Sequence, residues 1–262
     1  MEKVKKYELT EEFKVIGSTK VFRIKALRDF GNVKKGDIGG WIEKEENLSQ
    51  EGNAWVSDNV LIFDDAQISG NVLIFDDALI FDDVRISDNA QICGDVRISG
   101  NALICGDAQI SGNVLIFDDV RISGDAQIFG DVRISDNAQI SGNVLIFDDV
   151  RISDNAQICG DAQISGDAQI FGDALICGNV QIFGKSRISG DARISKTPLQ
   201  IQGSKHFVNM NGDLLQIGCQ LYSISSWKEH FERIGKAEKY SEKEIKEYKL
   251  YILLAEKLMD LN

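Results

Sequence analysis

The chain has 262 residues, of which 43% are hydrophobic and 27% are charged, and its formal net charge at pH 7 is −12. This apolar content can form a hydrophobic core, which excludes a disordered chain. An acidic surface repels the phosphates of nucleic acids and of anionic lipids, so direct binding to DNA, RNA or a membrane is disfavoured. We expect a cytoplasmic protein, because no apolar stretch has the length of a membrane span or the position of a signal peptide.

Residues 1–52 show no repeat, and we interpret them as a small N-terminal cap. They include a strand-like run from Lys20 to Leu27, and the apolar residues Trp41, Ile42 and Leu48 follow it. A stack of short strands exposes backbone groups and apolar side chains at its ends, so something must cover them. We expect Trp41, Ile42 and Leu48 to serve as the lid.

Residues 53–196 consist of 24 six-residue units without an insertion. Position 1 of a unit is mostly Asp or Asn, position 2 is Ala or Val, position 4 is Ile, and position 6 is mostly Gly or Asp. The fourth position is Ile in 23 of the 24 units, with Val56 as the exception, and Ser186 is the exception at the second position. Alternation of apolar and variable positions predicts short strands with one buried face.

Gly, Asp and Asn at the end of each unit tolerate a tight or left-handed backbone, so each unit is expected to turn a corner. Strands of about four residues cannot bury their Ile alone, but coils stacked at about 4.8 Å form a continuous column of Ile. The pattern therefore predicts a filled solenoid.

Units such as DAQISG, NVLIFD and NAQICG resemble the hexapeptide repeats of the left-handed parallel β-helix superfamily, in which three units form one triangular turn. The resemblance implies an all-β solenoid, a left-handed triangular parallel β-helix of about eight coils. A right-handed three-sided solenoid, as in the bactofilin filament proteins, is the structural alternative. The segment that begins at Phe22 resembles the leader of uncharacterised bacterial and phage hexapeptide-repeat proteins, which are loosely described as transferase-like or as polymer-forming cytoskeletal proteins.

Residues 197–262 leave the period at Thr197 and Pro198 and form a C-terminal segment of strands and two helices. We expect two or three strands between Leu199 and Ile224, with a turn at residues 211–213. Capping boxes at Ser226 with Glu229 and at Ser241 with Glu244 predict two helix starts, and Gly235 is expected to end the first helix. The second helix is apolar enough either to pack on the preceding strands and the solenoid end or to form an oligomer contact.

The search for catalytic, cofactor-binding and metal-binding residues gives none. Many members of the superfamily are acyltransferases with a histidine general base near a subunit interface, whereas His206 and His230 both lie outside the repeats. Two histidines are also too few for the three-histidine metal site of the carbonic-anhydrase branch. Asp-Asp pairs such as Asp64-Asp65 and Asp76-Asp77 recur by repeat register, and we interpret them as solvated corners. The five cysteines, Cys93, Cys105, Cys159, Cys177 and Cys219, are interpreted as free thiols.

Outward side chains can be assigned to three faces, because residues 18 apart stack in successive coils. Apolar residues concentrate on two of these faces, mainly in the early coils, and a contiguous exposed apolar patch commonly marks an interface. The candidate interface residues are Trp55, Leu61, Phe63, Leu73, Phe75, Leu79, Phe81, Leu115, Phe117, Leu145 and Phe147. The third face carries mostly Gln, Arg, Ser and Cys, and the N-terminal cap or the C-terminal helix could cover part of the apolar faces.

Our leading hypothesis is a non-enzymatic rigid scaffold or protein-binding module that forms a homo-oligomer or binds a protein partner through these Leu and Phe residues. A second hypothesis is an acidic inhibitor that mimics nucleic acid. The repeats carry a net charge of −13, which over about 38 Å gives only about half the charge density of duplex DNA. A third hypothesis is an acyltransferase-like enzyme that lacks the usual histidine within its repeats.

Overall fold

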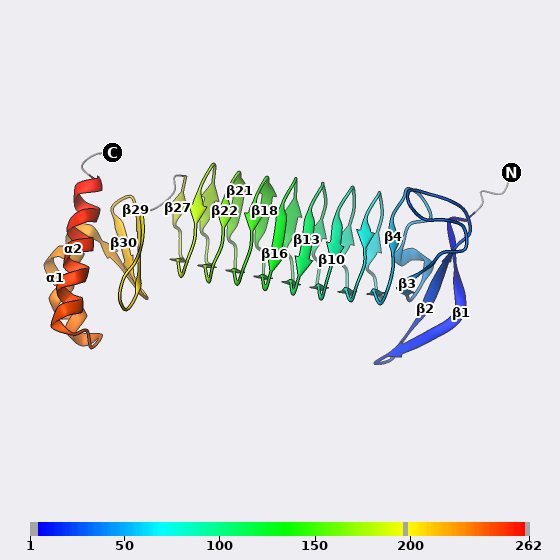
Figure 1. The fold of residues 1–262 in the computed structure, drawn as a ribbon, viewed down its shortest axis with the longest axis horizontal. Helices are drawn as coiled ribbons and strands as arrows, with labels where there is room; N and C mark the ends of the chain where they lie inside the picture. Colours follow the sequence, from blue (N-terminus) through cyan, green and yellow to red (C-terminus); the bar gives the residue numbers. More distant parts are fainter. Residues whose placement is uncertain (1–4, 196–198, 260–262) are drawn as a thin grey trace.

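The computed structural model describes residues 5–195 and 199–259 of the chain. It is an elongated column of stacked coils with a small folded unit at each end (Figure 1). The coils form three sheets in which every repeat strand is parallel to its neighbours in the adjacent coils. This arrangement confirms the expected triangular parallel β-solenoid with a C-terminal segment of strands and two helices.

We call the three sheets of the coils the first, second and third face. The first face comprises β5 (Leu61–Ile62), β8 (Leu79–Ile80), β11 (Arg97–Ile98), β14 (Leu115–Ile116), β17 (Arg133–Ile134), β20 (Arg151–Ile152), β23 (Gln169–Ile170) and β26 (Arg187–Ile188). The second face comprises β4 (Trp55–Val56), β7 (Leu73–Ile74), β10 (Gln91–Cys93), β13 (Gln109–Gly112), β16 (Gln127–Gly130), β19 (Leu145–Ile146), β22 (Gln163–Ile164) and β25 (Gln181–Ile182). The third face comprises β6 (Gln67–Ile68), β9 (Arg85–Ile86), β12 (Leu103–Ile104), β15 (Arg121–Ser123), β18 (Gln139–Gly142), β21 (Gln157–Gly160), β24 (Leu175–Cys177) and β27 (Arg193–Ile194).

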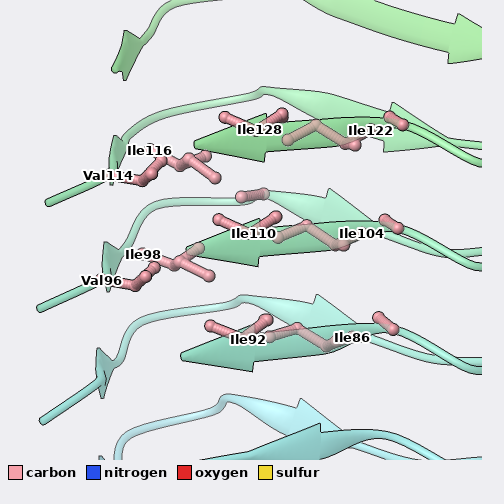
Figure 2. Packing of buried hydrophobic residues seen from close by; sticks show 14 of the residues in the cluster. Ile86, Ile92, Val96, Ile98, Ile104, Ile110, Val114, Ile116, Ile122 and Ile128 are labelled. Atoms are coloured by element: carbon pink, nitrogen blue, oxygen red, sulfur yellow. The ribbon is translucent and has the colours of Figure 1, made fainter. Parts of the chain in front are cut away.

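The core of the column consists of the residues at positions 2 and 4 of the units. Ile92 pairs with Ile110 in the next coil, and Ile98 pairs with Ile116 in the same way on another face. These isoleucines are at most 1% exposed, and Figure 2 shows them stacked coil above coil in the interior. Burial of each Ile contributes about 1.5–3 kcal/mol relative to leaving it exposed. The register is therefore fixed, because a slip by one residue would expose the whole column.

Position 6 forms the corner that the sequence predicts. Gly94 has a φ of 90°, and a Cβ built on it would lie 2.8 Å from the carbonyl oxygen of Gly112 in the next coil. Glycine is required there, because a side chain would collide with the backbone of the next corner. Where position 6 is Asp, as at Asp82 with a φ of 62°, the residue adopts an ordinary left-handed conformation instead.

The N-terminal unit extends the first face and adds part of a turn to the coils. β1 (Tyr7–Ile16) and β2 (Thr19–Ala26) form an antiparallel hairpin, β2 pairs with β3 (Ile38–Ile42), and β3 pairs in parallel with β5. The lid residues Trp41, Ile42 and Leu48 are buried, as expected. Leu48, directly after the 3-10 helix η1 (Glu45–Asn47), forms a parallel bridge with Ile68. Together with the eight turns of the repeats, this part of a turn gives the solenoid about nine turns.

The C-terminal unit is a four-stranded antiparallel sheet covered by two helices. The sheet consists of β28 (Leu199–Gln202), β29 (Phe207–Asn211), β30 (Leu214–Ile217) and β31 (Gln220–Ser223), one strand more than the sequence predicted. The helices are α1 (Ile224–Ala237) and α2 (Glu242–Met259). Tyr248, Ile252 and Ala255 of α2 are buried in one cluster with residues of the strands and of α1, so α2 packs on the preceding strands.

Two details of the predicted helix ends in the C-terminal unit are wrong and one is confirmed. The N-cap of the first helix is Ser223, three residues before Ser226, and it accepts a hydrogen bond from the Ser226 N–H. Gly235 does not end that helix, since it is buried against Ile245 two residues before the helix stops. The capping box of Ser241 and Glu244 is present as predicted, with hydrogen bonds in both directions.

Backbone hydrogen bonds join each coil to the next in both senses. The Leu73 N–H donates to the carbonyl oxygen of Ala90 one coil further on, whereas the Gly178 N–H donates to the carbonyl oxygen of Cys159 one coil back. An end coil is therefore left with both N–H groups and carbonyl oxygens. The N-terminal unit supplies donors and an acceptor, since Lys6 Nζ donates to the Ala54 carbonyl (2.8 Å), Asn47 Nδ2 donates to that of Ala66 (2.9 Å), and Glu43 Oε2 accepts the Asp64 N–H (2.7 Å).

The last coil is completed by a side chain with both a donor and an acceptor. Gln200 Oε1 accepts the N–H of Phe183 (2.8 Å), and Gln200 Nε2 donates to the carbonyl of Gln181 (2.8 Å). Ser186, the exception at position 2 of the repeat, donates its hydroxyl to Gln200 Oε1 (2.7 Å) and contacts Asn209 of β29 (3.1 Å). The departure from the repeat therefore marks the position where the coils meet the C-terminal sheet.

Candidate interaction surface

Positions 3 and 5 of each unit point outward, so every face carries two columns of surface side chains. On the first face, Leu61 pairs with Leu79, and the rings of Phe63 and Phe81 stack with centroids 5.3 Å apart and planes 7° from parallel. All four side chains are half-buried, mainly because each covers its neighbour. We call these four residues the Phe63–Phe81 patch. This patch is an ordered apolar surface, because stacking within the column covers only part of each ring.

Two further apolar pairs lie on the same two faces, away from this patch. Leu115 and Phe117 lie on the first face beyond Arg97, and both are half-buried. The second face carries Leu145 and Phe147, which are also half-buried. The structure therefore does not join the candidate residues into one surface, because polar units separate these pairs from the early coils.

At the start of the second face, one candidate residue packs against the N-terminal unit and two lie at the surface. Leu73 is 36% exposed and Phe75 is half-buried beside it. Trp55 is only 7% exposed, and its ring packs edge-on against Phe30 of the N-terminal unit with centroids 5.4 Å apart. Trp55 therefore belongs to the contact between cap and coils, and only the other candidates face outward.

A groove runs along the corner between the second and first faces, and the sequence analysis did not identify it. It has a volume of about 1070 Å³ and lies between the column of position 1 and the column of position 3 on the first face. The position 1 column is acidic and consists of Asp77, Asp95, Asn113, Asp131, Asp149 and Asp167. The position 3 column contributes Arg97, Leu115, Arg133, Arg151 and Gln169. In the sequence, this groove corresponds to Asp-Val-Arg units that recur on one face.

The two charged columns of this corner groove are poorly neutralised within the chain. Asp167 has Lys185 Nζ at 4.0 Å, and Asp131 accepts a hydrogen bond from Asn113 Nδ2 (2.7 Å). Among the described residues, no carboxylate oxygen lies within 4.0 Å of the guanidinium groups of Arg97, Arg133 or Arg151. The groove therefore presents separate lines of negative and positive charge to its surroundings.

The third face is polar, and its cysteines correct one expectation. Cys159 and Cys177 are neighbours in the sheet with Cα atoms 4.6 Å apart, and they form a disulfide rather than two free thiols. Stacking at equivalent positions of adjacent coils brings residues 18 apart into bonding range, which spacing rules for zinc or close disulfide motifs do not detect. Cys93, Cys105 and Cys219 are free, and burial raises the pKa of the Cys93 thiol above its ordinary value.

The Asp-Asp pairs lie at corners, as interpreted from the register. Asp76 and Asp82 occupy position 6 with positive φ, and each accepts a hydrogen bond through Oδ2 from the N–H of the glycine one coil on (3.1 and 3.0 Å). These carboxylates support the corners of the backbone. No group of three or more His, Cys, Asp and Glu side chains arranged to hold a metal occurs within residues 5–195 and 199–259.

Both histidines lie in the C-terminal unit, far along the chain from the apolar patches. His206 follows β28, and Tyr248 of α2 donates its hydroxyl to the His206 carbonyl (2.7 Å) while it accepts the N–H of Lys205 (3.0 Å). His230 lies on α1 with Glu229 Oε2 3.8 Å away. Neither imidazole lies on the coils. Across the described part of the chain, no helix combines the length and hydrophobicity needed to cross a membrane.

Comparisons with known proteins agree with the repeat architecture. The model of the family described as "Bactofilin: Polymer-forming cytoskeletal" matches residues 84–187, which lie within the coils. The uncharacterized acetyltransferase YdcK of Escherichia coli (strain K12) is 39% identical over 69 residues, 23% of this chain and 21% of that protein. The chain therefore spans about a fifth of the length of this curated relative.

Two solved structures also match parts of the chain. UDP-N-acetylglucosamine O-acyltransferase (LpxA) from Moraxella catarrhalis RH4 is 17% identical, with 57% of this chain and 65% of that chain covered and a TM-score of 0.27. UDP-N-acetylglucosamine acyltransferase from Campylobacter jejuni is 14% identical, with 81% and 96% covered and a TM-score of 0.27. Over part of its length, the chain is thus similar to a family described as polymer-forming and to a protein described as an uncharacterized acetyltransferase.

Proposed function

We propose that this protein is a non-enzymatic rigid scaffold that self-associates through the outward Leu and Phe residues of the first and second faces. The observation that carries the proposal is the Phe63–Phe81 patch, with Leu73 and Phe75 on the adjoining face. Apolar side chains repeated at a fixed spacing form a flat surface that a matching copy can cover. The candidate residues that face outward are therefore the proposed contacts.

The construction of the column supports a scaffold. Its core is continuous from Tyr7 to Ile194, and each coil is hydrogen-bonded to the next along three sheets. A rod of this kind holds its surface columns at fixed spacing, because the buried isoleucines allow only one register. Contacts made by one coil are therefore repeated in register by the following coils.

The covered ends favour contacts between the sides of the rods. Lys6 and Asn47 complete the first coil, and Gln200 completes part of the last coil. Groups that are already hydrogen-bonded offer little to a second copy at an open end. The match to a polymer-forming family within residues 84–187 supports self-association by the coils themselves.

Light scattering across a concentration series tests this proposal. We expect the wild-type chain to form an assembly, and we expect the variant Phe63→Ser, Phe75→Ser, Phe81→Ser to associate at least about tenfold more weakly, since burial of a Phe contributes about 1.5–3 kcal/mol. The rings are half-buried on the surface and outside the core, so the variant should keep the far-ultraviolet circular dichroism spectrum of the wild type.

The matched control changes three outward residues of the third face in the same region, Gln67→Ser, Arg85→Ser and Leu103→Ser. These side chains are exposed and lie outside the proposed interface. The control should associate like the wild type. A wild-type chain that stays monomeric at every concentration would contradict the proposal, and so would a control that loses association to the same degree as the Phe variant.

A second candidate function is acyl transfer, which the similarity to the E. coli acetyltransferase YdcK favours. The residues available as general base would be His206 and His230, and both lie on the C-terminal unit. The two functions differ in one property that equilibrium dialysis measures. An acyltransferase must bind an acyl donor, whereas a scaffold has no need to do so.

A further inference from the structure

We infer that the corner groove is the contact that sets the register between two copies of this chain, with the rods side by side and parallel. This inference rests on the proposed self-association and names its partner, a second copy, and its geometry. It uses the charged side chains of positions 1 and 3, whereas the apolar patch contains Leu61 and Leu79 at the start of the position 3 column.

The first step is the imbalance of charge in the groove. Asp131, Asp149 and Asp167 follow one another in adjacent coils at position 1, so their carboxylates stack at the strand spacing of about 4.8 Å. Like charges at this spacing repel one another, and within the described part of the chain only the last of them has a cation, Lys185, within 4.0 Å. A partner that places cations along this column would remove the repulsion.

The second step is that the chain itself carries the cations that fit. Arg97, Arg133 and Arg151 lie on the opposite wall of the groove, each in the same unit as an aspartate of the acidic column. They have no carboxylate within 4.0 Å among the described residues. Guanidinium groups recognise carboxylates through paired hydrogen bonds, so each wall of the groove is complementary to the other wall of a second copy.

Symmetry then selects the orientation. A two-fold axis parallel to the rods brings every coil opposite the same coil of the partner and exchanges the two columns across the groove. In this arrangement Arg97 faces Asp95 of the second copy, and the equivalent pairs are Arg133 with Asp131 and Arg151 with Asp149. All three arginines are neutralised, and each pair occurs twice.

The antiparallel arrangement fails by the same argument. A two-fold axis across the rods leaves each column opposite its own kind, so aspartates would face aspartates along the interface.

The third face also carries arginines in Asp-Val-Arg units, but these arginines do not line a groove. Arg85 and Arg121 also belong to Asp-Val-Arg units, with Asp83 and Asp119 at position 1. They lie two coils apart and do not border the groove, whereas Arg133 and Arg151 are direct neighbours in one sheet. Arg85 and Arg121 therefore provide a control of the same sequence type.

The test uses two full-length variants with opposite groove charge. In the acidic variant, Arg97→Asp, Arg133→Asp and Arg151→Asp make both columns negative. In the basic variant, Asp95→Arg, Asp131→Arg and Asp149→Arg make both positive, and Lys185 shows that position 1 of this face accommodates a long cation. We expect each variant alone to associate at least about tenfold more weakly than the wild type, and an equimolar mixture to recover association as a one-to-one complex.

The remaining outcomes separate this inference from the proposed function. The control Arg85→Asp, Arg121→Asp should associate like the wild type, and wild-type association should weaken as NaCl is raised. If the wild type associates but both charge variants associate equally well, or if their mixture fails to recover association, the groove register is wrong while the scaffold stands. If the wild type is monomeric throughout, both the scaffold and the register are wrong.

Discussion

The two ends of the solenoid complete the backbone hydrogen bonds with different groups. At the N-terminal end the Lys6 ammonium, the Asn47 amide and the backbone N–H of Trp41 donate to carbonyl oxygens, and the Glu43 carboxylate accepts an N–H. At the C-terminal end one amide, Gln200, accepts the Phe183 N–H and donates to the Gln181 carbonyl. Each end coil presents both kinds of group, because parallel strands exchange hydrogen bonds in both senses. The caps therefore differ in the charge of the groups that they supply, although both cover the same kind of core.

The N-terminal end also differs in its degree of burial. Lys6 is fully buried, and its ammonium group lies 5.2 Å from the Phe30 ring centroid. Burial, with a smaller contribution from Arg28, lowers the pKa of Lys6 to about 8. Gln200 is half-exposed and uncharged, so water can replace part of what it provides. Replacement of Lys6 should therefore cost more stability than replacement of Gln200.

The largest expected effect is reversal of the donor at the N-terminal end. Lys6→Glu places an acceptor against the carbonyl oxygens of Ala54 and Glu51 in place of the donor that they now face. We expect the cap to lose about 3–5 kcal/mol of stability, because a carboxylate is buried against carbonyl oxygens. Urea unfolding monitored by Trp41 and Trp55 fluorescence measures this in a Trp227→Phe background, since the chain has three tryptophans.

Lys6→Met serves as the control for that substitution. It removes the donor but buries no charge, so the expected loss is about 1–3 kcal/mol. Equal losses for Lys6→Glu and Lys6→Met would show that packing, and not hydrogen bonding to the carbonyl oxygens, decides the identity of this residue.

A smaller effect is expected at the C-terminal end. Gln200→Leu removes the acceptor for the Phe183 N–H and the donor for the Gln181 carbonyl, at an expected cost of about 1–2 kcal/mol. Hydrogen exchange should rise about tenfold in residues 181–188, since about 1.4 kcal/mol corresponds to a factor of ten.

Gln200→Glu is the matched variant for this end, because it keeps the acceptor and loses only the donor. It should therefore exchange more slowly than Gln200→Leu. An unchanged exchange rate in both variants would mean that the C-terminal sheet, and not this side chain, protects the last coil.

The smallest expected effect is a pH dependence confined to the N-terminal end. The folded pKa of Lys6 is about 8 and its ordinary value is 10.5, so the unfolded chain binds more protons between these values. Stability must then rise by about 1 kcal/mol as pH increases from 8 to 9, and further toward pH 10. Above pH 10 the raised pKa of Tyr7, which burial causes first, works in the opposite direction.

Unfolding at pH 8, 9 and 10 measures this dependence, again by the fluorescence of the two N-terminal tryptophans. Lys6→Met should lose the rise, while Gln200→Leu should keep it. A rise that persists in Lys6→Met would assign the dependence to another group.

The repeat and the fold of the coils could be predicted from the sequence because each unit encodes its own strand and corner. Ile at position 4 and Gly or Asp at position 6 act over six residues and occur together in 22 of the 24 units. The capping box at Ser241 is a local signal of the same kind. The N-cap at Ser223 was missed because β31 continues directly into α1, so Ser226 gave a stronger pattern than the true start.

The candidate surface was predicted only in part, because exposure depends on segments far apart in the chain. The spacing of 18 residues placed Phe63 above Phe81, and the rings do stack. It could not show that Phe30 covers Trp55, or that Cys159 and Cys177 approach closely enough to form a disulfide. The corner groove was not predicted, because it lies between two columns of side chains, whereas outward residues were assigned to faces one column at a time.

The sequence by itself determined the period, the buried column of isoleucine, the corners and the acidity of the coils, since each arises from contacts within a unit or from simple composition. Only the tertiary structure decided how the ends are completed, which apolar residues stay outside and where opposite charges face each other across a groove. The physical reason is that these features depend on donors, acceptors and rings brought together from distant segments. Lys6 and Ala54 are 48 residues apart, and no repeat relates them.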